Sequence, residues 1–450
     1  MSSVVTPVVG DETLERLQRD TFSYFLDETN PSNGLVRDST REGSSSSIAA
    51  TGFALAAYTI GVERQFITRA DATNRALTTL RFLWESPQGE QRDATGYKGF
   101  FYHFLDMQTG RRALKCELST IDTTFLMAGA LAAAAYFDRE TADEREISAL
   151  ANALYHRVDW QWAQNGEPAV SHGWKPESGF IRHRWQGYNE AILLYVLGLG
   201  SPTHPLPAES YAAWTRTYRW KRLYGQEFLY AGPLFIHQFS HMWIDFRGIQ
   251  DEYMRGRGID YFENSRRATL AQQRYAIRNP KGFKEYGEFC WGLTASDGPG
   301  PATPQIDGIE RRFYDYRARG IPYGADDGTI APWAAVASLP FAPEIVLPTI
   351  AHLEARPQMM SRYGLRCSFN PTFTDESRFL NGWHSQRFFG IDQGPVVLMI
   401  ENYQSEMLWN LMKRCPAIVR GLRRAGFRGR LADRGQRVRK GATAQSIERD

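Results

Sequence analysis

Two segments of this 450-residue chain consist almost entirely of apolar and small residues over about four helical turns. They read "SIAATGFALAAYTIG" from Ser47 and "IDTTFLMAGALAAAAYF" from Ile121. A helix that is apolar around its whole circumference has to be buried. Amphipathic segments such as 12–28 and 67–86 flank them, so buried and half-exposed helices alternate. This pattern predicts an all-α fold in which an outer ring of helices covers an inner ring, the (α/α)6 barrel or toroid.

Helical patterns recur along most of the chain. A helical solenoid would contain a similar number of helices, but it would show a sequence period of about 20–50 residues, and none is visible. The expected helices are 12–28, 46–61, 67–86, 120–137, 142–163, 187–199, 207–219, 234–245, 260–277, 328–338, 343–355 and 395–412. Four long segments rich in Gly, Trp, Tyr, His and Asp separate them and are expected to lie as loops over a cleft: 87–119, 164–186, 278–327 and 356–394. We therefore predict one domain over residues 10–425.

The C-terminal region has a different character from the rest of the chain. Between Lys413 and Lys440 it carries eleven Lys and Arg against one acid, while the formal net charge of the whole chain is only +3. Residues 426–450 are also poor in apolar side chains and are predicted to form a disordered, solvated tail without a nucleic-acid partner.

The location of the protein is predicted from what the sequence lacks. No signal-peptide pattern is visible, and no run of about 18 apolar residues predicts a membrane span. Four widely spaced cysteines form no C-x-x-C pair and fit a reducing compartment. We expect a cytoplasmic protein, or a periplasmic one if an export signal was removed.

Acidic residues recur at the starts of the apolar helices. Asp122 and Glu190 fall in first turns, Asp392 just before a helix, and Asp326 and Asp327 at the start of another. A single acid in such a place complements the helix dipole. In an inner ring, however, the helix starts converge on one cavity, which these carboxylates would line. Paired carboxylates in a cleft are the equipment of a glycoside hydrolase.

Aromatic and histidine residues leave alternatives open. The 12 Trp and 21 Tyr suit either a carbohydrate groove or a large aromatic core. His237, His241 and Asp245 would share one face of helix 234–245, as metal ligands, as sugar contacts or as packing residues. Gln238 replaces the glutamate of an H-E-x-x-H metalloprotease motif. Phosphate-binding glycine loops and G-x-S-x-G elbows are absent.

Several long stretches together resemble glycoside hydrolase family 144, the bacterial glucoamylase-like domain proteins whose characterised members are β-1,2-glucanases. The resemblance covers about residues 12–415. It rests on "GLVRDSTREGSSSSIAATGFAL", "GFFYHFLDMQTGRR", "ELSTIDTTFLMAGAL", "GYNEAILLYVLGLGSPTHP", "GPLFIHQFSHMWIDFRGIQD", "FCWGLTASDGP", "YGADDGTIAPWAA" and "IDQGPVVLMIENYQS". It implies an (α/α)6 barrel that hydrolyses β-1,2-linked glucan or an oligosaccharide derived from it. It also implies that the reaction inverts the anomeric configuration and needs neither a metal nor an organic cofactor. The alternatives are a retaining transglycosylase acting on the same glucan and a non-catalytic glucan-binding protein.

The resemblance also suggests roles for individual residues. Glu190, in the G-Y-N-E motif, matches the position of the general acid, and Glu117, Asp122 and Asp392 match other acids around the cleft. The base is left open among these three. The residues expected to contact sugar rings and hydroxyls are His103, Trp174, Tyr188, His237, His241, Arg247, Trp291, Asp327 and Glu401. Endo or exo action, product length and oligomeric state are also left open.

Overall fold

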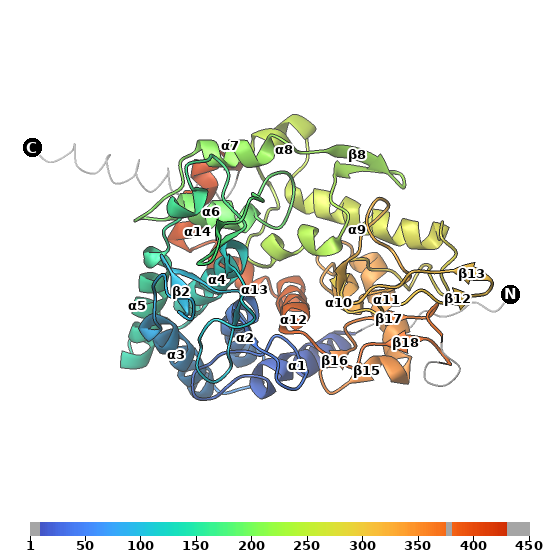
Figure 1. The fold of residues 1–450 in the computed structure, drawn as a ribbon, viewed down its shortest axis with the longest axis horizontal. Coiled ribbons are helices and arrows are strands. Elements are labelled where there is room, and N and C mark those ends of the chain that lie inside the picture. Colours follow the sequence, from blue (N-terminus) through green and yellow to red (C-terminus); the bar gives the residue numbers. More distant parts are fainter. Residues whose placement is uncertain (1–9, 375–379, 430–450) are drawn as a thin grey trace, which may run out of the picture.

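The computed structural model describes residues 10–374 and 380–429, and this part of the chain is mostly helical (Figure 1). The prediction of a mostly helical fold is thereby confirmed. The α-helices are α1 Asp11–Asp27, α2 Ile48–Glu63, α3 Arg69–Glu85, α4 Thr120–Tyr136, α5 Ala142–Arg157, α6 Ile192–Gly200, α7 Glu209–Thr215, α8 Glu252–Arg257, α9 Tyr261–Arg278, α10 Pro332–Val336, α11 Pro343–Glu354, α12 Gly390–Gln404, α13 Met407–Met412 and α14 Pro416–Arg424. Short 3₁₀ helices lie at Trp162–Gln164, Leu234–His237, Phe239–Met242 and Pro357–Met359.

The strands are two to four residues long and pair only in small antiparallel sheets. The pairs are β1 Ser46–Ser47 with β4 Phe104–Leu105, β2 Gly96–Tyr97 with β3 Phe100–Phe101, β8 Trp220–Leu223 with β9 Gln226–Leu229, β10 Ile249–Gln250 with β19 Arg428–Gly429, β11 Ala295–Ser296 with β14 Arg317–Ala318, β12 Gln305–Ile306 with β13 Ile309–Glu310, β15 Met360–Ser361 with β16 Gly364–Leu365, and β17 Phe369–Asn370 with β18 Trp383–His384. A three-stranded sheet joins β5 Leu118–Ser119, β6 Gly173–Lys175 and β7 Gly179–Phe180. Because β1 and β5 run directly into α2 and α4, their pairing fixes where these two helices begin.

The apolar helices form the centre of the molecule, as their composition predicts. Nearly every residue of α2, α4, α6 and α12 is buried, whereas α1, α3, α5 and α9 bury one face. In the core, α2 packs against α4 and α12, and α6 packs against α14. Figure 1 shows α12 near the middle of the view, and α1 packs beside it although the two come from opposite ends of the chain. None of the described helices combines the length and apolar character needed to cross a membrane.

Several predicted helix boundaries are wrong. The segment 234–245 forms two short 3₁₀ helices rather than one α-helix, and the expected helix 328–338 shrinks to α10. Helix α6 begins at Ile192, so Glu190 precedes it. Helix α12 already begins at Gly390 and carries Pro395 in its interior, although proline is commoner at helix starts. Helices α8 and α14 were not predicted.

The end of the described chain is also better ordered than its composition suggests. Residues 430–450 of the predicted tail lie outside the described residues. Its first residues, in contrast, pack on the body: Phe427 is buried and β19 pairs with β10.

Glycines allow α2 and α4 to touch backbone to backbone. A Cβ on Gly129 would lie 1.9 Å from the carbonyl oxygen of Gly52. Gly129→Ala should therefore lower the free energy of unfolding by about 2 kcal/mol or more, since the helices have to move apart. Urea denaturation measures the effect. Gly256→Ala in α8 is the control, because nothing lies within 4 Å of its added methyl group. Equal stability of the two variants would contradict the tight packing.

Candidate functional site

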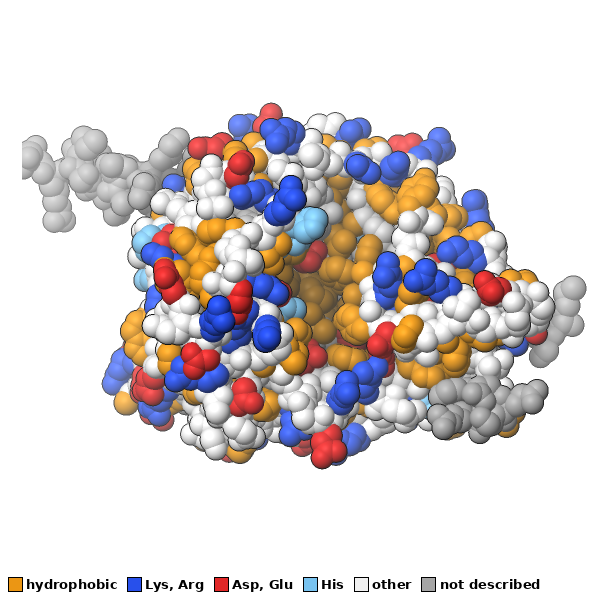
Figure 2. All heavy atoms as spheres, viewed as in Figure 1, with side chains coloured by type: hydrophobic (Ala, Val, Ile, Leu, Met, Phe, Trp, Pro, Cys, Tyr) orange, Lys and Arg blue, Asp and Glu red, His pale blue; other side chains and the backbone are white. Residues whose placement is uncertain are grey.

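A cavity of about 480 Å³ lies in the hollow near the centre of the face shown in Figure 2. Its wall contains five acids, two basic side chains and many apolar and aromatic groups. The lining residues are Asp38, Ser47, His103, Phe104, Ile121, Asp122, Phe125, Glu190, Phe235, Phe239, Ala295, Asp315, Tyr316, Trp333, Arg387, Phe389, Ile391 and Asp392. Flat apolar faces beside carboxylates suit a sugar chain, whose rings have apolar faces and hydroxyl edges.

Three of the acids reach the cavity from the starts of buried helices, as the sequence predicts. Asp122 lies in the first turn of α4, where the Ser119 hydroxyl donates to Asp122 Oδ2 at 2.5 Å. Asp392 lies in the first turn of α12. Glu190 lies in the turn before α6, and the Ser240 hydroxyl fixes this turn by donating to the Glu190 carbonyl oxygen at 2.9 Å.

Glu190 holds its proton more tightly than an exposed glutamate. Loss of solvation raises the pKa of Glu190 from 4.5 to about 7, and the negative charge of Asp122 adds to the rise. Phe125, Phe235 and Phe239 line the cavity with it and account for the apolar surroundings. A carboxyl group that is still partly protonated near neutral pH is able to act as a general acid.

Asp392 is a buried carboxyl group without a nitrogen or oxygen donor among the described residues. The thiol of Cys367 is close enough to influence it. Burial raises the pKa of Asp392 well above its ordinary value, and the Asp38 charge acts in the same direction. Asp392 therefore holds its proton more tightly than an exposed aspartate.

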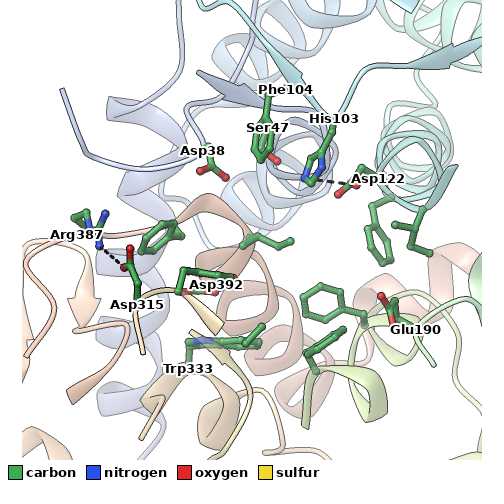
Figure 3. Close-up of a pocket in the computed structure, with 18 residues that line it drawn as sticks. Asp38, Ser47, His103, Phe104, Asp122, Glu190, Asp315, Trp333, Arg387 and Asp392 are labelled. Atoms are coloured by element: carbon green, nitrogen blue, oxygen red, sulfur yellow. Dashed lines mark ion pairs between the residues drawn. The ribbon is translucent and has the colours of Figure 1, made fainter. Parts of the chain in front are cut away.

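His103 faces two carboxylates, one through each ring nitrogen. Its Nδ1 lies 2.9 Å from Glu117 Oε1. Its Nε2 lies 3.6 Å from Asp122 Oδ2, an ion pair that is drawn in Figure 3. Burial opposes a charge on the ring, but Asp122 and Glu117 outweigh it and raise the pKa of His103 to about 9. The hydrogen bond from His103 in turn lowers the pKa of Glu117 to about 2. Glu117 does not line the cavity and meets it only through His103.

Arg387 and Asp315 lie together on another side of the cavity (Figure 3). Arg387 Nη2 lies 3.5 Å from Asp315 Oδ1 and 2.5 Å from Asp297 Oδ1. The rings of Tyr316 and Phe389 contact each other at a tilt of 54°, with their centroids 5.4 Å apart. A cation and an acid therefore border the space beside the aromatic wall.

The segment that carries Asp38 is joined to the segment that precedes α12. Thr40 N–H donates to the Phe388 carbonyl oxygen at 3.0 Å, and Phe388 N–H donates to Thr40 Oγ1 at 3.1 Å. Gly390 N–H donates to the Asp38 carbonyl oxygen at 2.9 Å. The cavity is thus assembled from both ends of the described chain.

Comparison with known proteins identifies the family. Residues 182–416 match the family model Glycoamylase, described as "Putative glucoamylase", and make up more than half of the chain. The chain belongs to the glucoamylase-like family. The resemblance noted from the sequence motifs is thereby confirmed.

Relatives of this glucoamylase-like chain include β-1,2-glucan hydrolases. It is 29% identical to an exo β-1,2-glucooligosaccharide sophorohydrolase of Parabacteroides distasonis over 94% of its own length, and it spans 59% of that relative. A structure described as a putative glucoamylase from Bacteroides uniformis has 32% identity and a TM-score of 0.83, covering 94% of this chain and 99% of that one. An endo-β-1,2-glucanase from Chitinophaga pinensis, in complex with sophorotriose and glucose, has 28% identity and a TM-score of 0.82, with coverages of 94% and 99%.

The two central histidines of the glucoamylase-like chain lie outside the cavity wall. His241 Nε2 lies 3.0 Å from Ser265 Oγ, and His237 Nε2 lies 3.3 Å from the Ala231 carbonyl oxygen. Burial lowers the pKa of His237 to about 4 and that of His241 to about 3, so both rings are neutral. Both side chains are buried, because the short 3₁₀ helices turn them into the core.

The metal alternative lacks a ligand set in this arrangement. The Asp245 carboxylate is occupied by Arg247 at 2.7 Å and by Lys413 at 2.8 Å. Within residues 10–374 and 380–429, no group of three or more His, Cys, Asp or Glu side chains is placed to hold a metal ion.

Of the nine residues predicted to contact sugar, only His103 lines the cavity. Beyond the two histidines, the remaining six have other partners or neighbours. Trp174 packs against Tyr97 and Trp162, Tyr188 stacks near Tyr261, Arg247 pairs with Asp245 and Glu406, Trp291 donates to Thr349, Asp327 pairs with Arg319, and Glu401 pairs with Arg64. Their side-chain chemistry suits sugar binding equally well, so residue type alone does not separate these roles.

Sequence reasoning missed Asp38, Asp315, Trp333 and Arg387. Three of them lie in irregular segments, where no helical or strand periodicity predicts which way a side chain points. Asp38 and Trp333 fall within the quoted motifs "GLVRDSTREGSSSSIAATGFAL" and "YGADDGTIAPWAA", which was the only signal available.

Proposed function

We propose that this chain is a glycoside hydrolase that cleaves β-1,2-linked glucan or its oligosaccharides. One observation carries the proposal: a glutamate with a pKa near 7 shares a cavity with other carboxylates and with aromatic side chains. The chain's relationship, at about 29% identity, to hydrolases that act on β-1,2-glucan supports the linkage. Residues 10–425 would form the single catalytic domain.

The proposed architecture is an (α/α)6 double ring. The buried helices α2, α4, α6 and α12 belong to the inner ring, and the half-exposed helices α1, α3 and α5 belong to the outer one. The close packing of α2 against α4 and α12 supports this arrangement. Inner-ring helices whose starts carry the acids would hold them rigidly around the sugar.

In the proposed reaction, Glu190 protonates the glycosidic oxygen as the bond to the leaving sugar breaks. A second carboxylate, Asp122 or Asp392, takes a proton from the attacking water, and the anomeric configuration inverts. Asp122 is the acid that electrostatically influences Glu190, and it faces the positive ring of His103. Burial favours the protonated form of Asp392, so to act as a base it would have to lose a proton when substrate binds. Separate Asp122→Asn and Asp392→Asn variants, compared by kcat, assign the base.

The substrate proposal is tested by a panel of β-1,2, β-1,3, β-1,4 and α-1,4 glucans. We expect reducing ends to appear only with the β-1,2 glucan, and NMR of the first product should show the α anomer. A first product in the β configuration, or cyclic and lengthened products, would instead indicate a retaining transglycosylase. Glucose release from starch would overturn the linkage assignment. Measurable glucan affinity without any cleavage would indicate a binding protein.

The protonation state of Glu190 predicts the alkaline side of the pH profile. The general acid must carry its proton, and its pKa is about 7. We therefore expect kcat/KM to fall above about pH 7, by about tenfold for each further pH unit. Initial rates on linear β-1,2-glucan between pH 5 and 9 measure this limb. A constant kcat/KM up to pH 9 would remove Glu190 from the acid role.

A further inference from the structure

We infer that His103 is a positioning residue: Glu117 holds its ring from behind, and the ring holds Asp122 at the cavity wall. The inference rests on the proposed function only for its kinetic consequence. The arrangement itself is independent of the substrate. In this arrangement His103 orients Asp122 instead of binding sugar. Glu117, which does not line the cavity, acts by holding the His103 ring.

The geometry favours a positively charged ring. Both ring nitrogens of His103 face carboxylate oxygens, at 2.9 Å on Glu117 and 3.6 Å on Asp122. The shorter contact is a hydrogen bond, in which Nδ1 has to carry the hydrogen because an ionised carboxylate only accepts. The longer contact is an ion-pair distance, and a second N–H at Nε2 gives the ring the positive charge that this side of the pair calls for. The ring also stacks on Phe104, with centroids 3.9 Å apart, which limits its rotation.

Backbone hydrogen bonds also fix the position of His103. His103 N–H donates to the Glu117 carbonyl oxygen at 2.9 Å, and the His103 carbonyl oxygen accepts from Ile48 N–H at 3.3 Å. His103 therefore lies at the point where the starts of α2 and α4 meet. The backbone of His103 is therefore held by residues at the starts of two core helices.

The contacts on Asp122 leave one of its oxygens available. Both Ser119 Oγ and His103 Nε2 face Asp122 Oδ2, so neither uses Oδ1. A fixed Oδ2 orients the plane of the carboxylate and with it the direction of Oδ1. The charge of His103 also lowers the pKa of Glu117 and opposes the rise in the pKa of Asp38.

The charged groups around His103 come from several elements. Asp122 belongs to α4, Glu117 precedes β5, and Asp38 precedes β1. All three acids raise the pKa of His103, against the effect of burial. On the outer side, Lys175 of β6 acts on Glu117 in the same direction as His103. The pKa of Asp38 is itself raised to about 6 by burial, with His103 opposing the rise.

The first experiment needs no substrate. NMR titration of ¹³C,¹⁵N-histidine-labelled protein follows each of the nine histidines, and His103→Asn identifies the missing signal. In the wild type we expect the His103 signal to titrate near pH 9, with both nitrogens protonated at pH 7. In Glu117→Gln the midpoint should fall by at least about one pH unit, because one of the facing charges is lost. A wild-type midpoint near 6.5, or an unchanged midpoint in Glu117→Gln, would overturn the inference whatever the substrate is.

The second experiment asks whether the charged ring serves the reaction. In the Glu117→Gln variant the His103 ring loses its proton at a lower pH than in the wild type. The ratio of the variant's kcat/KM to the wild-type value should therefore decline by about twofold or more between about pH 6 and pH 8. His103→Asn should move the acidic limb of the profile upward by about one pH unit, since the facing acids lose their cation. His204→Asn, which changes a half-exposed histidine outside the cavity, is the control.

The outcomes separate three cases. A ratio that stays constant with pH would mean that Glu117 only supports the fold, and it would overturn the inference. Loss of glucan cleavage in every assay, with a normal His103 titration, would overturn the proposed function and leave the charged ring established. The predicted titration together with the predicted pH-dependent ratio would support both.

Discussion

Glu190→Gln should fold normally and lose activity on β-1,2-glucan by about 10²–10⁴-fold, the contribution typical of a general acid. Glutamine has nearly the same shape but has no acidic proton to give to the leaving oxygen. Because Glu190 lies in a turn fixed by its backbone carbonyl, the side-chain change leaves that anchor intact. The measurement is kcat/KM on linear β-1,2-glucan, with glucan affinity determined in parallel.

Stability supplies an internal check on the same variant. The pKa of Glu190 is about 7 in the folded protein, against 4.5 for the ordinary group. The folded state therefore binds more protons, and wild-type stability declines as the pH rises from about 4.5 to about 7. Glu190→Gln lacks this decline, so its melting temperature should exceed that of the wild type most clearly above pH 7.

The matched control is Glu209→Gln, which changes an exposed glutamate in the first turn of α7. It should leave both activity and the pH dependence of melting unchanged. Near wild-type turnover of Glu190→Gln would rule out this residue as the acid. A similar loss in Glu209→Gln would show that the assay reports general damage.

Asp327→Asn should have the largest effect on stability. Arg319 and Asp327 are joined by two parallel hydrogen bonds of 2.7 Å and 2.8 Å, and neither side chain is exposed to solvent. Asparagine leaves the arginine charge buried without its counter-ion, which costs about 3–5 kcal/mol of unfolding free energy. Urea denaturation measures the loss. Glu146→Gln, in the exposed pair with Arg81, is the control and should cost less than about 1 kcal/mol.

The same variant separates the two interpretations of Asp327. Arg319 Nη2 also donates to the carbonyl oxygens of Tyr314 and Asp315, and so supports the segment that brings Asp315 to the cavity. If Asp327 has a structural role, Asp327→Asn should lower the free energy of unfolding and raise KM as a secondary effect. A direct sugar contact, as the sequence suggested, predicts weaker glucan binding at unchanged stability.

The sequence predicts the helical core and part of the cavity for clear physical reasons. The uniformly apolar composition of α2 and α4 leaves burial as the only stable arrangement, and the acids at helix starts are brought together when those helices pack. The position of Glu190 is less accurate, since it precedes α6 rather than starting it. Glu190 nevertheless lines the cavity, although the predicted start of its helix was wrong.

The positions of other candidate residues could not be predicted, because their side chains suit more than one environment. His237 and Trp291 carry groups that suit either a ligand or the core, and only the three-dimensional packing shows that they are buried. Arg387 and Asp315 lie in irregular segments and reach the cavity through long-range contacts, which local patterns do not encode. The charged state of His103 depends on Glu117 and Asp122, whose proximity follows from the pairing of loops.

The contact between Thr40 and Phe388 has a consequence for the order of folding. These residues are 348 positions apart, and their hydrogen bonds join the two segments that carry Asp38 and Asp392. During synthesis, the first half of the chain leaves the ribosome long before its partner segment exists. The apolar helices α2 and α4 are able to pair early, but the cavity acquires its last wall only when α12 has been made. The cavity would therefore be completed only once α12 has been synthesised, and truncation just before α12 would remove its last wall while much of the helical core is still present.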